Sequence, residues 1–198
     1  MARRFDISNK LIHFTGSGEP MDDAFARLKA IIREGRLIGG GRMIRGGYRC
    51  ISFTEAPLAA FAPASISQFP FTRYSPFGLM FGKNWIYDHG GRPVIYQPDC
   101  DFDLLPEELR WRHVRFEPTG ENVIDWTWER EWRIRRDELS FTPAEAAIVV
   151  PDQAWENELR RIHDAYQDMV VELYAEAVDQ DIAEMWREEF PWREIPLG

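Results

Sequence analysis

The order of apolar segments along this chain constrains its fold more than any single motif does. Runs of strand length are predicted at residues 10–15, 49–54, 77–81, 92–97, 113–117, 126–135 and 146–150. Helical spacing is confined to an early segment, one short turn at 84–87 and the end of the chain. Strands and helices do not alternate regularly, which argues against a doubly wound parallel sheet. We expect an α+β fold with a mixed, mainly antiparallel sheet core.

The early helix is predicted over residues 21–34. Asp22 and Asp23 suit a first helical turn, and apolar residues recur behind them at helical spacing. Gly35 is a natural stop because glycine readily adopts the left-handed conformation that ends many helices. The glycine- and arginine-rich stretch at 35–47 is predicted to be a mobile, basic loop.

The pattern becomes helical again after Asp152. Apolar residues follow at spacings of three and four, and a second helix is predicted at about 179–189. We therefore expect two parts. Residues 1–151 form a mixed α+β core domain, and residues 152–198 form an acidic helical pair packed on that core.

Charge is distributed unevenly along the chain. Residues 152–198 hold 13 acids and 4 bases, a net charge of −9, whereas residues 1–49 hold 10 bases and 5 acids. Arginine dominates the bases, and its planar fork suits phosphate and carboxylate groups. The basic half could thus meet a phosphorylated ligand or a nucleic acid. The alternative is that the acidic tail lies over the basic half and neutralises it.

Several observations bear on the compartment. No stretch of about 18 apolar residues indicates a membrane span. The start of the chain has two arginines without the apolar run of a secretory signal. Cys50 and Cys100 do not make a disulfide framework, although the sequence leaves open whether they pair. We expect a cytoplasmic protein with no membrane partner.

Two carboxylates lie two residues apart in the aromatic stretch 126–134. On a strand, Glu129 and Glu131 would project side by side. Neighbouring carboxylates repel, which can raise one pKa and divide their roles. One can then stabilise a cationic transition state while the other binds or deprotonates a nucleophile. The alternative is that both acids only pair with the arginines that follow them.

Two earlier strands carry polar side chains at the same spacing. His13 and Thr15 would share one strand face, and Ser52 and Thr54 another. Such groups can bond the hydroxyls of a sugar. They are also ordinary residues of a core or a strand ladder.

Other common sites are not indicated by the sequence. The four histidines show no ligand spacing, and neither CxxC nor HExxH occurs. No GxGxxG or GxxxxGK[ST] loop is present, and no GxSxG elbow marks a serine hydrolase. We expect no metal.

In its order of H-x-T, S-x-T and E-x-E strands, the chain resembles the ADP-ribosyltransferase fold. A closer likeness is to the bacterial AbiGi-like abortive-infection family, and the Ile51–Phe53 strand with the late glutamate is similar to the DarT group, which modifies DNA bases. The segments that carry the likeness are 50–58, 74–81, 92–96 and 128–134, and it spans about residues 10–150.

The resemblance implies an NAD-dependent ADP-ribosyltransferase-like protein of a phage-defence or toxin–antitoxin system. Glu131 would be the catalytic glutamate that cleaves the nicotinamide–ribose bond, with Glu129 as its helper and His13 on the ribose. The residues expected to contact NAD are Thr15, Ser52, Thr54, Tyr74, Trp128 and Arg45. NAD would be the substrate, with a nucleic-acid or protein acceptor and a cognate antitoxin or toxin as partners.

Two other readings stay open. The chain could be a non-catalytic antitoxin or adaptor that binds a protein or nucleic-acid partner, and some relatives of this kind are labelled antitoxins. It could also be a metal-free nuclease that uses His13 and the two glutamates.

Overall fold

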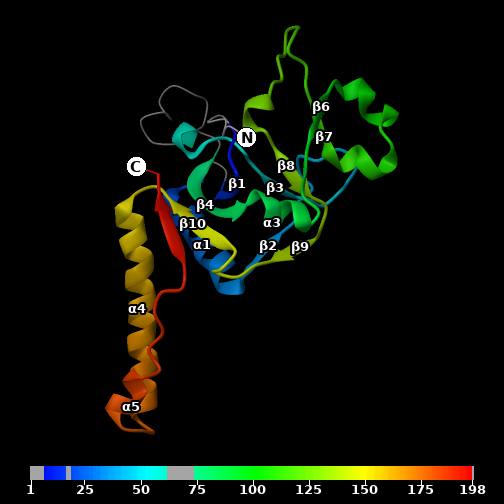
Figure 1. The fold of residues 1–198 in the computed structure, drawn as a ribbon. Coiled ribbons are helices and arrows are strands. Elements are labelled where there is room, and N and C mark those ends of the chain that lie inside the picture. Colours follow the sequence, from blue (N-terminus) through cyan, green and yellow to red (C-terminus); the bar gives the residue numbers. More distant parts are fainter. Residues whose placement is uncertain (1–6, 17–18, 62–73, 198) are drawn as a thin grey trace.

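The computed structural model describes residues 7–16, 19–61 and 74–197, which form an α+β fold (Figure 1). Its helices are α1 (Met21–Glu34), α3 (Lys83–Asp88), α4 (Gln153–Ala175) and α5 (Gln180–Glu184), with 3-10 segments η1 (Leu58–Phe61), η3 (Asp99–Leu104), η4 (Glu107–Arg112) and η5 (Thr127–Glu129). Its strands are β1 (Lys10–Gly16), β2 (Arg36–Ile38), β3 (Ile51–Phe53), β4 (Ser75–Gly82), β5 (Arg92–Pro93), β6 (Ile95–Gln97), β7 (His113–Arg115), β8 (Trp132–Ile134), β9 (Glu138–Ser140), β10 (Ala146–Val150) and β11 (Arg193–Pro196). The α+β class, with mixed and antiparallel sheets and a C-terminal helical pair, is confirmed.

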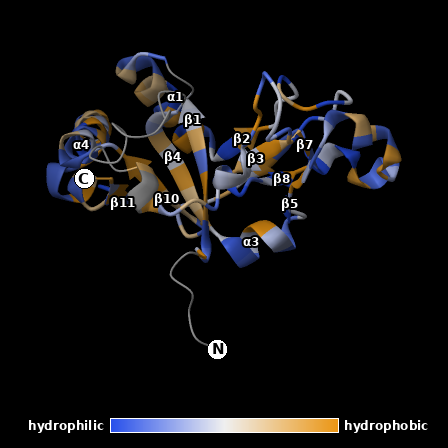
Figure 2. Ribbon diagram, turned by 90° about the horizontal axis from the view of Figure 1, so that it is seen from above, coloured by the Kyte–Doolittle hydropathy of each residue, from blue (hydrophilic) through white to orange (hydrophobic). Residues whose placement is uncertain are grey.

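The largest sheet has four strands in the order β1-β4-β10-β11. β4 runs antiparallel to β1 and β10, and β10 runs parallel to β11. All five residues of β10 are buried, as expected for a strand covered on both faces. Leu79 lies opposite Ile148 and Phe81 opposite Leu11, and all four belong to the main core beneath α1 and α4. Figure 2 shows the apolar residues concentrated on these central strands.

A second sheet, β3-β8-β5, is antiparallel throughout. It meets the first sheet where Ile12 and Thr54 exchange two backbone hydrogen bonds of 2.9 and 2.8 Å. Ile12 of β1 is therefore paired with Thr54, the residue that directly follows β3. This junction brings His13 of β1 against the carbonyl of Ser52 of β3.

Two small ladders complete the body: β2 pairs antiparallel with β9, and β6 pairs parallel with β7. The first corrects the predicted loop at 35–47, because Arg36–Ile38 is a strand. Gly39 ends that strand against the backbone of Arg136, whose carbonyl oxygen would clash with any Cβ at this position. The glycine here therefore permits close backbone approach.

The early helix has the predicted bounds. Ala24, Phe25 and Leu28 are buried, and Asp22 and Asp23 lie in the first turn, where negative charge favours the helix dipole. Gly35 ends α1 with φ of 62° and donates its N–H to the carbonyl of Ile31, so the predicted stop is confirmed.

The chain beyond Asp152 first leaves the body and then returns to it (Figure 1). α4 and α5 project away from the sheets, and α5 is shorter than the predicted helix at 179–189. The return ends in β11, which the sequence did not predict and which joins the main sheet beside β10. The domain boundary at 151/152 stays a prediction.

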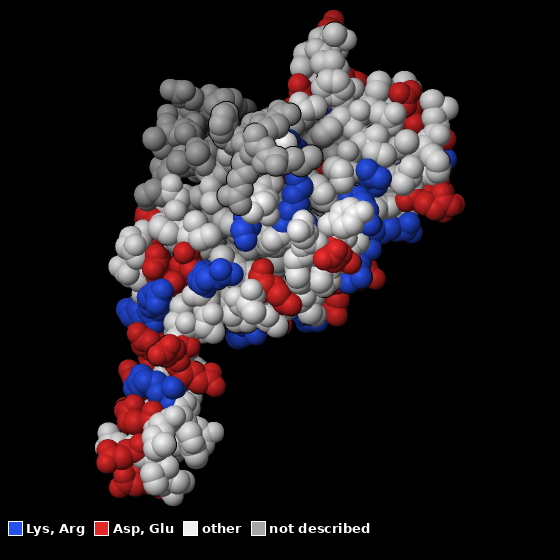
Figure 3. All heavy atoms as spheres, in the orientation of Figure 1, with Lys and Arg blue, Asp and Glu red and all other residues white. Residues whose placement is uncertain are grey.

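The acidic segment mainly pairs with its own arginines. Arg161 pairs with Glu158, and Arg187 pairs with Asp168 and Glu184, all within the projecting helices or just after them. In Figure 3 the acids line the projecting part below the body. The expectation that this tail neutralises the basic N-terminal half is therefore not supported by the ion pairs of the described residues.

Among residues 7–16, 19–61 and 74–197, no helix combines the length and the apolar character needed to cross a bilayer.

The start of α4 provides a test of the fold. The Asp152 side chain accepts hydrogen bonds from the N–H groups of Ala154 and Trp155, at 2.8 and 3.3 Å. Asp152→Ala should lower the free energy of unfolding by about 1 kcal/mol, because these donors lose their cap. Urea denaturation followed by circular dichroism measures the change. Asp152→Asn is the control and should stay near wild type; equal losses in both variants would contradict the capping role.

Candidate functional site

A cavity of about 390 Å³ lies against the strands β5 and β8. We call it the Glu131 cavity. Its lining residues are Ile7, Glu55, Pro93, Val94, Tyr96, Thr127, Arg130, Glu131 and Trp132. It combines two carboxylates with a phenol and an indole, a mixture of polar and aromatic groups typical of small-molecule sites.

The stretch before β8 is not the strand that the sequence predicted. Thr127–Glu129 is a 3-10 turn, and Arg130 adopts a left-handed conformation with φ of 46°. The Asp125 carboxylate starts the turn by accepting from both the N–H and the hydroxyl of Thr127, at 2.9 and 2.6 Å. Such local side-chain bonds compete with strand pairing.

The two glutamates consequently do not project side by side, and the predicted shared face is wrong. Glu129 accepts a hydrogen bond of 2.8 Å from the Tyr74 hydroxyl. Glu131 instead meets Arg133. The turn at Arg130 breaks the two-residue period on which the prediction depended.

Arg133 holds the Glu131 carboxylate at both oxygens. Its Nε donates to Oε1 at 2.8 Å and its Nη2 donates to Oε2 at 3.1 Å. Its Nη1 donates to the carbonyls of Trp111 and His113, both at 3.0 Å, and the residue is only 4% exposed. A bidentate pair of this kind fixes the orientation of the carboxylate. The predicted alternative of a pairing arginine thus applies to Glu131, although its side chain still lines the cavity.

Glu55 is a second acid of the cavity, and sequence reasoning did not include it among the site residues. It is buried, its Oε1 lies 2.6 Å from Lys83 Nζ, and its Oε2 accepts from the Trp132 indole at 2.9 Å. The available signal was its place directly after the hydroxyl-bearing strand at 51–54. Its partner is one of only three lysines in the chain.

Tyr96 was also missed, and it links the cavity to the turn. Its hydroxyl donates to the carbonyl of Trp126 and accepts from the N–H of Glu131, both at 3.1 Å. Burial raises the pKa of Tyr96 to about 12, so the phenol stays protonated at neutral pH. The hydroxyl therefore helps to fix the position of Glu131.

His13 lies outside the lining of the Glu131 cavity. Its Nδ1 donates to the carbonyl of Ser52 at 2.8 Å, and its ring packs 5.8 Å from the ring of Phe53. Burial lowers the pKa of His13 and so favours the neutral ring, while the hydrogen bond to Ser52 opposes this shift. Because a carbonyl only accepts, the neutral ring carries its proton on Nδ1 and leaves Nε2 as an acceptor. His13 and Glu131 were expected to act on the same ribose, yet only Glu131 is among the residues that line the cavity.

The predicted hydroxyl residues mainly hold backbone. Thr15 donates to the carbonyl of Phe77 at 3.2 Å. Thr54 donates to the carbonyl of Glu129 at 2.7 Å and accepts from the N–H of Ala56 at 3.1 Å. Ser52 lies opposite Arg133 in the β3–β8 ladder. Thr54 therefore positions the turn, and Ser52 lies beside the strand that carries the Arg133 side chain.

Tyr74 and Trp128 gather beside Glu129 in a small aromatic cluster. Both pack against Ala56 and Phe61. The structure thus brings together Tyr74, Trp128 and Glu129, three of the predicted site residues, next to Thr54 and separately from His13.

Arg45 belongs to neither group. Its guanidinium lies 2.7 Å from the Asp99 carboxylate and 3.8 Å from that of Asp103, above the ring of Phe102. The residue therefore braces the loop after β2 against η3.

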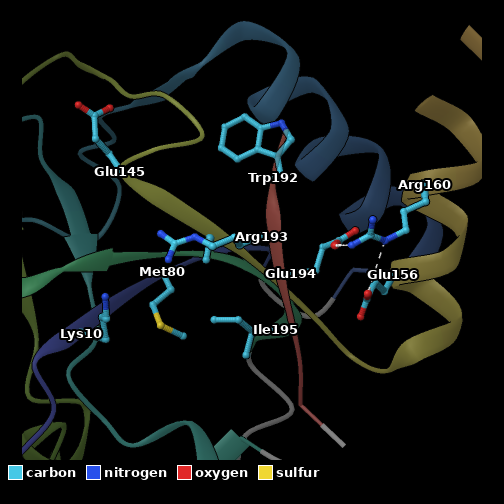
Figure 4. A pocket seen from close by; sticks show the side chains of 10 residues that line it. Lys10, Met80, Glu145, Glu156, Arg160, Trp192, Arg193, Glu194 and Ile195 are labelled. Atoms are coloured by element: carbon cyan, nitrogen blue, oxygen red, sulfur yellow. Dashed lines mark hydrogen bonds and ion pairs between the residues drawn. The ribbon is translucent and has the colours of Figure 1, made fainter. Parts of the chain in front are cut away.

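A second cavity, of about 480 Å³, lies beside β11 (Figure 4). Its lining includes none of the predicted site residues. Glu194 lies on one side of it, paired with Arg160 of α4, and burial raises the pKa of this acid. Because only the Glu131 cavity has a predicted site residue in its lining, we take it as the candidate site.

Comparison of the chain with protein-family models, with curated proteins and with solved structures gave no match. The chemistry of the site must therefore be argued from its own residues. Within the part of the chain that the structure describes, no group of three or more histidine, cysteine, aspartate or glutamate side chains is arranged to hold a metal ion.

The buried pair provides a stability test. Arg133→Met should lower the free energy of unfolding by about 3–5 kcal/mol, because it leaves the Glu131 carboxylate and two carbonyls without their donor. The matched control is Arg115→Met, which removes an exposed arginine paired with Glu117 and should cost about 1 kcal/mol or less. Urea denaturation measures both. Similar losses in the two variants would contradict the central role of Arg133.

The two cysteines differ in reactivity and do not pair in the structure. Burial raises the pKa of Cys50 to about 11, whereas Cys100 is exposed. A thiol reagent at pH 8 should therefore label Cys100 alone in the native protein, and both cysteines after unfolding. Cys100→Ser should leave the native chain unlabelled. Rapid labelling of that variant would show that Cys50 is accessible.

Proposed function

We propose that this chain is an NAD-dependent ADP-ribosyltransferase-like protein of a phage-defence or toxin–antitoxin system. The observation that supports the proposal is the Glu131 carboxylate, held by Arg133 at the wall of a cavity of about 390 Å³. This volume falls within the range of small-ligand sites, about 300–1,000 Å³. The aromatic rings of Tyr96 and Trp132 in the lining suit a flat ring such as nicotinamide.

The proposed reaction breaks the bond between nicotinamide and ribose. Both electrons of that bond leave with nicotinamide, and the ribose carbon develops oxocarbenium character. The Glu131 carboxylate would stabilise this positive charge, and its fixed orientation means that little reorganisation is needed. An acceptor nucleophile, or water, then forms the new bond to the ribose carbon and gives up its proton.

The other predicted residues take supporting roles. His13 holds the carbonyl of Ser52, which lies opposite Arg133 in the β3–β8 ladder, so we regard His13 as a positioning residue. Glu129 and Tyr74 hydrogen-bond to each other and do not line the Glu131 cavity. Arg45 does not enter the proposal because Asp99 and Asp103 engage its guanidinium.

Nicotinamide release from NAD tests the function directly. NAD should raise the melting temperature of the wild-type protein, and Glu131→Gln should reduce nicotinamide release by about 100-fold or more through loss of charge stabilisation. Glu121→Gln, at an exposed position, is the control with the same chemical change and should keep wild-type activity.

Because Glu131→Gln also removes a charge beside buried Arg133, its fold must be checked by circular dichroism. A folded Glu131→Gln variant that releases nicotinamide at the wild-type rate would refute the assignment. So would a wild-type protein that neither binds NAD nor releases nicotinamide.

The alternative function is a non-catalytic antitoxin or adaptor. The projecting acidic helices α4 and α5 favour it, because an arm outside the body is suited to contact a partner (Figure 1). Under this alternative the pairs of Glu131 with Arg133 and of Glu129 with Tyr74 are purely structural. NAD would then leave the melting temperature unchanged.

A further inference from the structure

α4 carries one continuous apolar stripe from its first turn to its last. The stripe consists of Trp155, Leu159, Ile162, Tyr166, Met169, Val170 and Leu173. Residues three and four apart share a helix face, so this spacing places all seven on one side.

The first half of the stripe is part of the main core. Leu159 is buried, and Trp155 and Ile162 pack against the same cluster. The Trp155 ring lies 4.8 Å from that of Phe25 and 5.0 Å from that of Phe77. This half is therefore an established packing surface of the fold.

The second half of the same stripe has no such cover. α4 extends beyond the body (Figure 1). Tyr166, Met169 and Leu173 are exposed, and the exposed fraction of Leu173 is 66%. α5 and the residue pair that follows it add Ile182, Met185 and Trp186, with Met185 exposed to 80%. Exposed apolar residues that share one helix face, as Tyr166, Met169 and Leu173 do on α4, are typical of interaction sites.

The returning chain covers a different side of α4. Gln167 and Val171 are buried there, and Gln167 accepts from the N–H of Glu188 at 3.1 Å. The Tyr174 and Trp186 rings meet at 4.6 Å, edge to face. These contacts hold α4 and α5 together as one unit and leave the stripe outside the contact.

Charge selects the kind of partner. Residues 164–189, which we call the distal arm, contain nine acids and one base, a net charge of −8. Figure 3 shows many acidic and few basic side chains along the arm. Two such arms would repel each other, and so would an arm and a nucleic acid or an anionic membrane. A cationic protein surface is complementary to it.

We propose that the distal arm docks a basic amphipathic segment of a partner protein. The apolar ridge of that segment would cover Tyr166, Met169 and Leu173, and its lysines or arginines would face acids such as Glu172 and Glu176. This docking is independent of the proposed NAD chemistry, because none of the arm residues lines the Glu131 cavity.

A synthetic helical peptide of leucines and lysines, patterned to be amphipathic, is the probe. Binding to the full-length chain is measured by fluorescence anisotropy of the labelled peptide. We expect Leu173→Glu to weaken binding at least tenfold. Leu104→Glu is the matched control, because Leu104 is an exposed leucine at the end of η3 and lies outside the arm. This variant should bind the peptide as strongly as wild type.

Two control peptides separate the parts of the proposal. Replacing the lysines with glutamates should abolish binding, and replacing the leucines with serines should weaken it strongly. Equal binding by Leu173→Glu and wild type, or by the glutamate peptide, would overturn the proposal.

Other occupants give distinct results. A wild-type dimer in analytical ultracentrifugation that becomes monomeric with Leu173→Glu would assign the stripe to a second copy and overturn the proposal. Binding to neutral phosphatidylcholine vesicles that Leu173→Glu abolishes would assign it to a membrane surface and overturn it equally. A wild-type protein that is monomeric, does not bind these vesicles and binds the lysine peptide through Leu173 supports the proposal.

Discussion

The buried guanidinium of Arg133 connects two segments of this chain, residues 111–113 and residues 131–133. From β8 it reaches the Glu131 carboxylate and the carbonyls of Trp111 and His113. A buried charge without its partners is strongly destabilising, so the backbone at 111–113 and the carboxylate must hold their places together. Arg133 therefore fixes the Glu131 side chain at the cavity, and it ties the backbone of Trp111 in η4 and His113 in β7 to β8.

The turn before β8 shows how tertiary contacts override a strand-like pattern. Asp125 starts the turn locally, and Thr54 and Tyr96 then bond its backbone from other strands. Arg130 takes a left-handed conformation that a non-glycine residue seldom adopts, and the surrounding bonds hold it there. The result separates Glu129 from Glu131 and places only the second at the cavity.

The body and the distal arm present two unlike surfaces. The body carries a cavity lined by polar and aromatic groups, whereas the arm displays exposed apolar residues among many acids. α4 joins the body to the arm, because its stripe packs on the core at Leu159 and is free of the body at Leu173. A protein that combines catalysis with regulated partner binding would need both surfaces, and each can be tested without the other.

The sequence alone determined the elements whose signals are local. The helix at 21–34 with its stop at Gly35, the strand at 146–150 and the helix start at Asp152 were predicted, because periodicity and capping act between near neighbours. The sequence also selected Glu131 as a site residue. It did so because Glu131 was expected to share a strand face with Glu129, and the turn removes that shared face. Only the tertiary structure decided that β11 returns to β10, that Glu55 meets Lys83, and that the acidic helices project from the body. These features depend on hydrogen bonds, buried charge pairs and packing between distant segments, which no local pattern encodes.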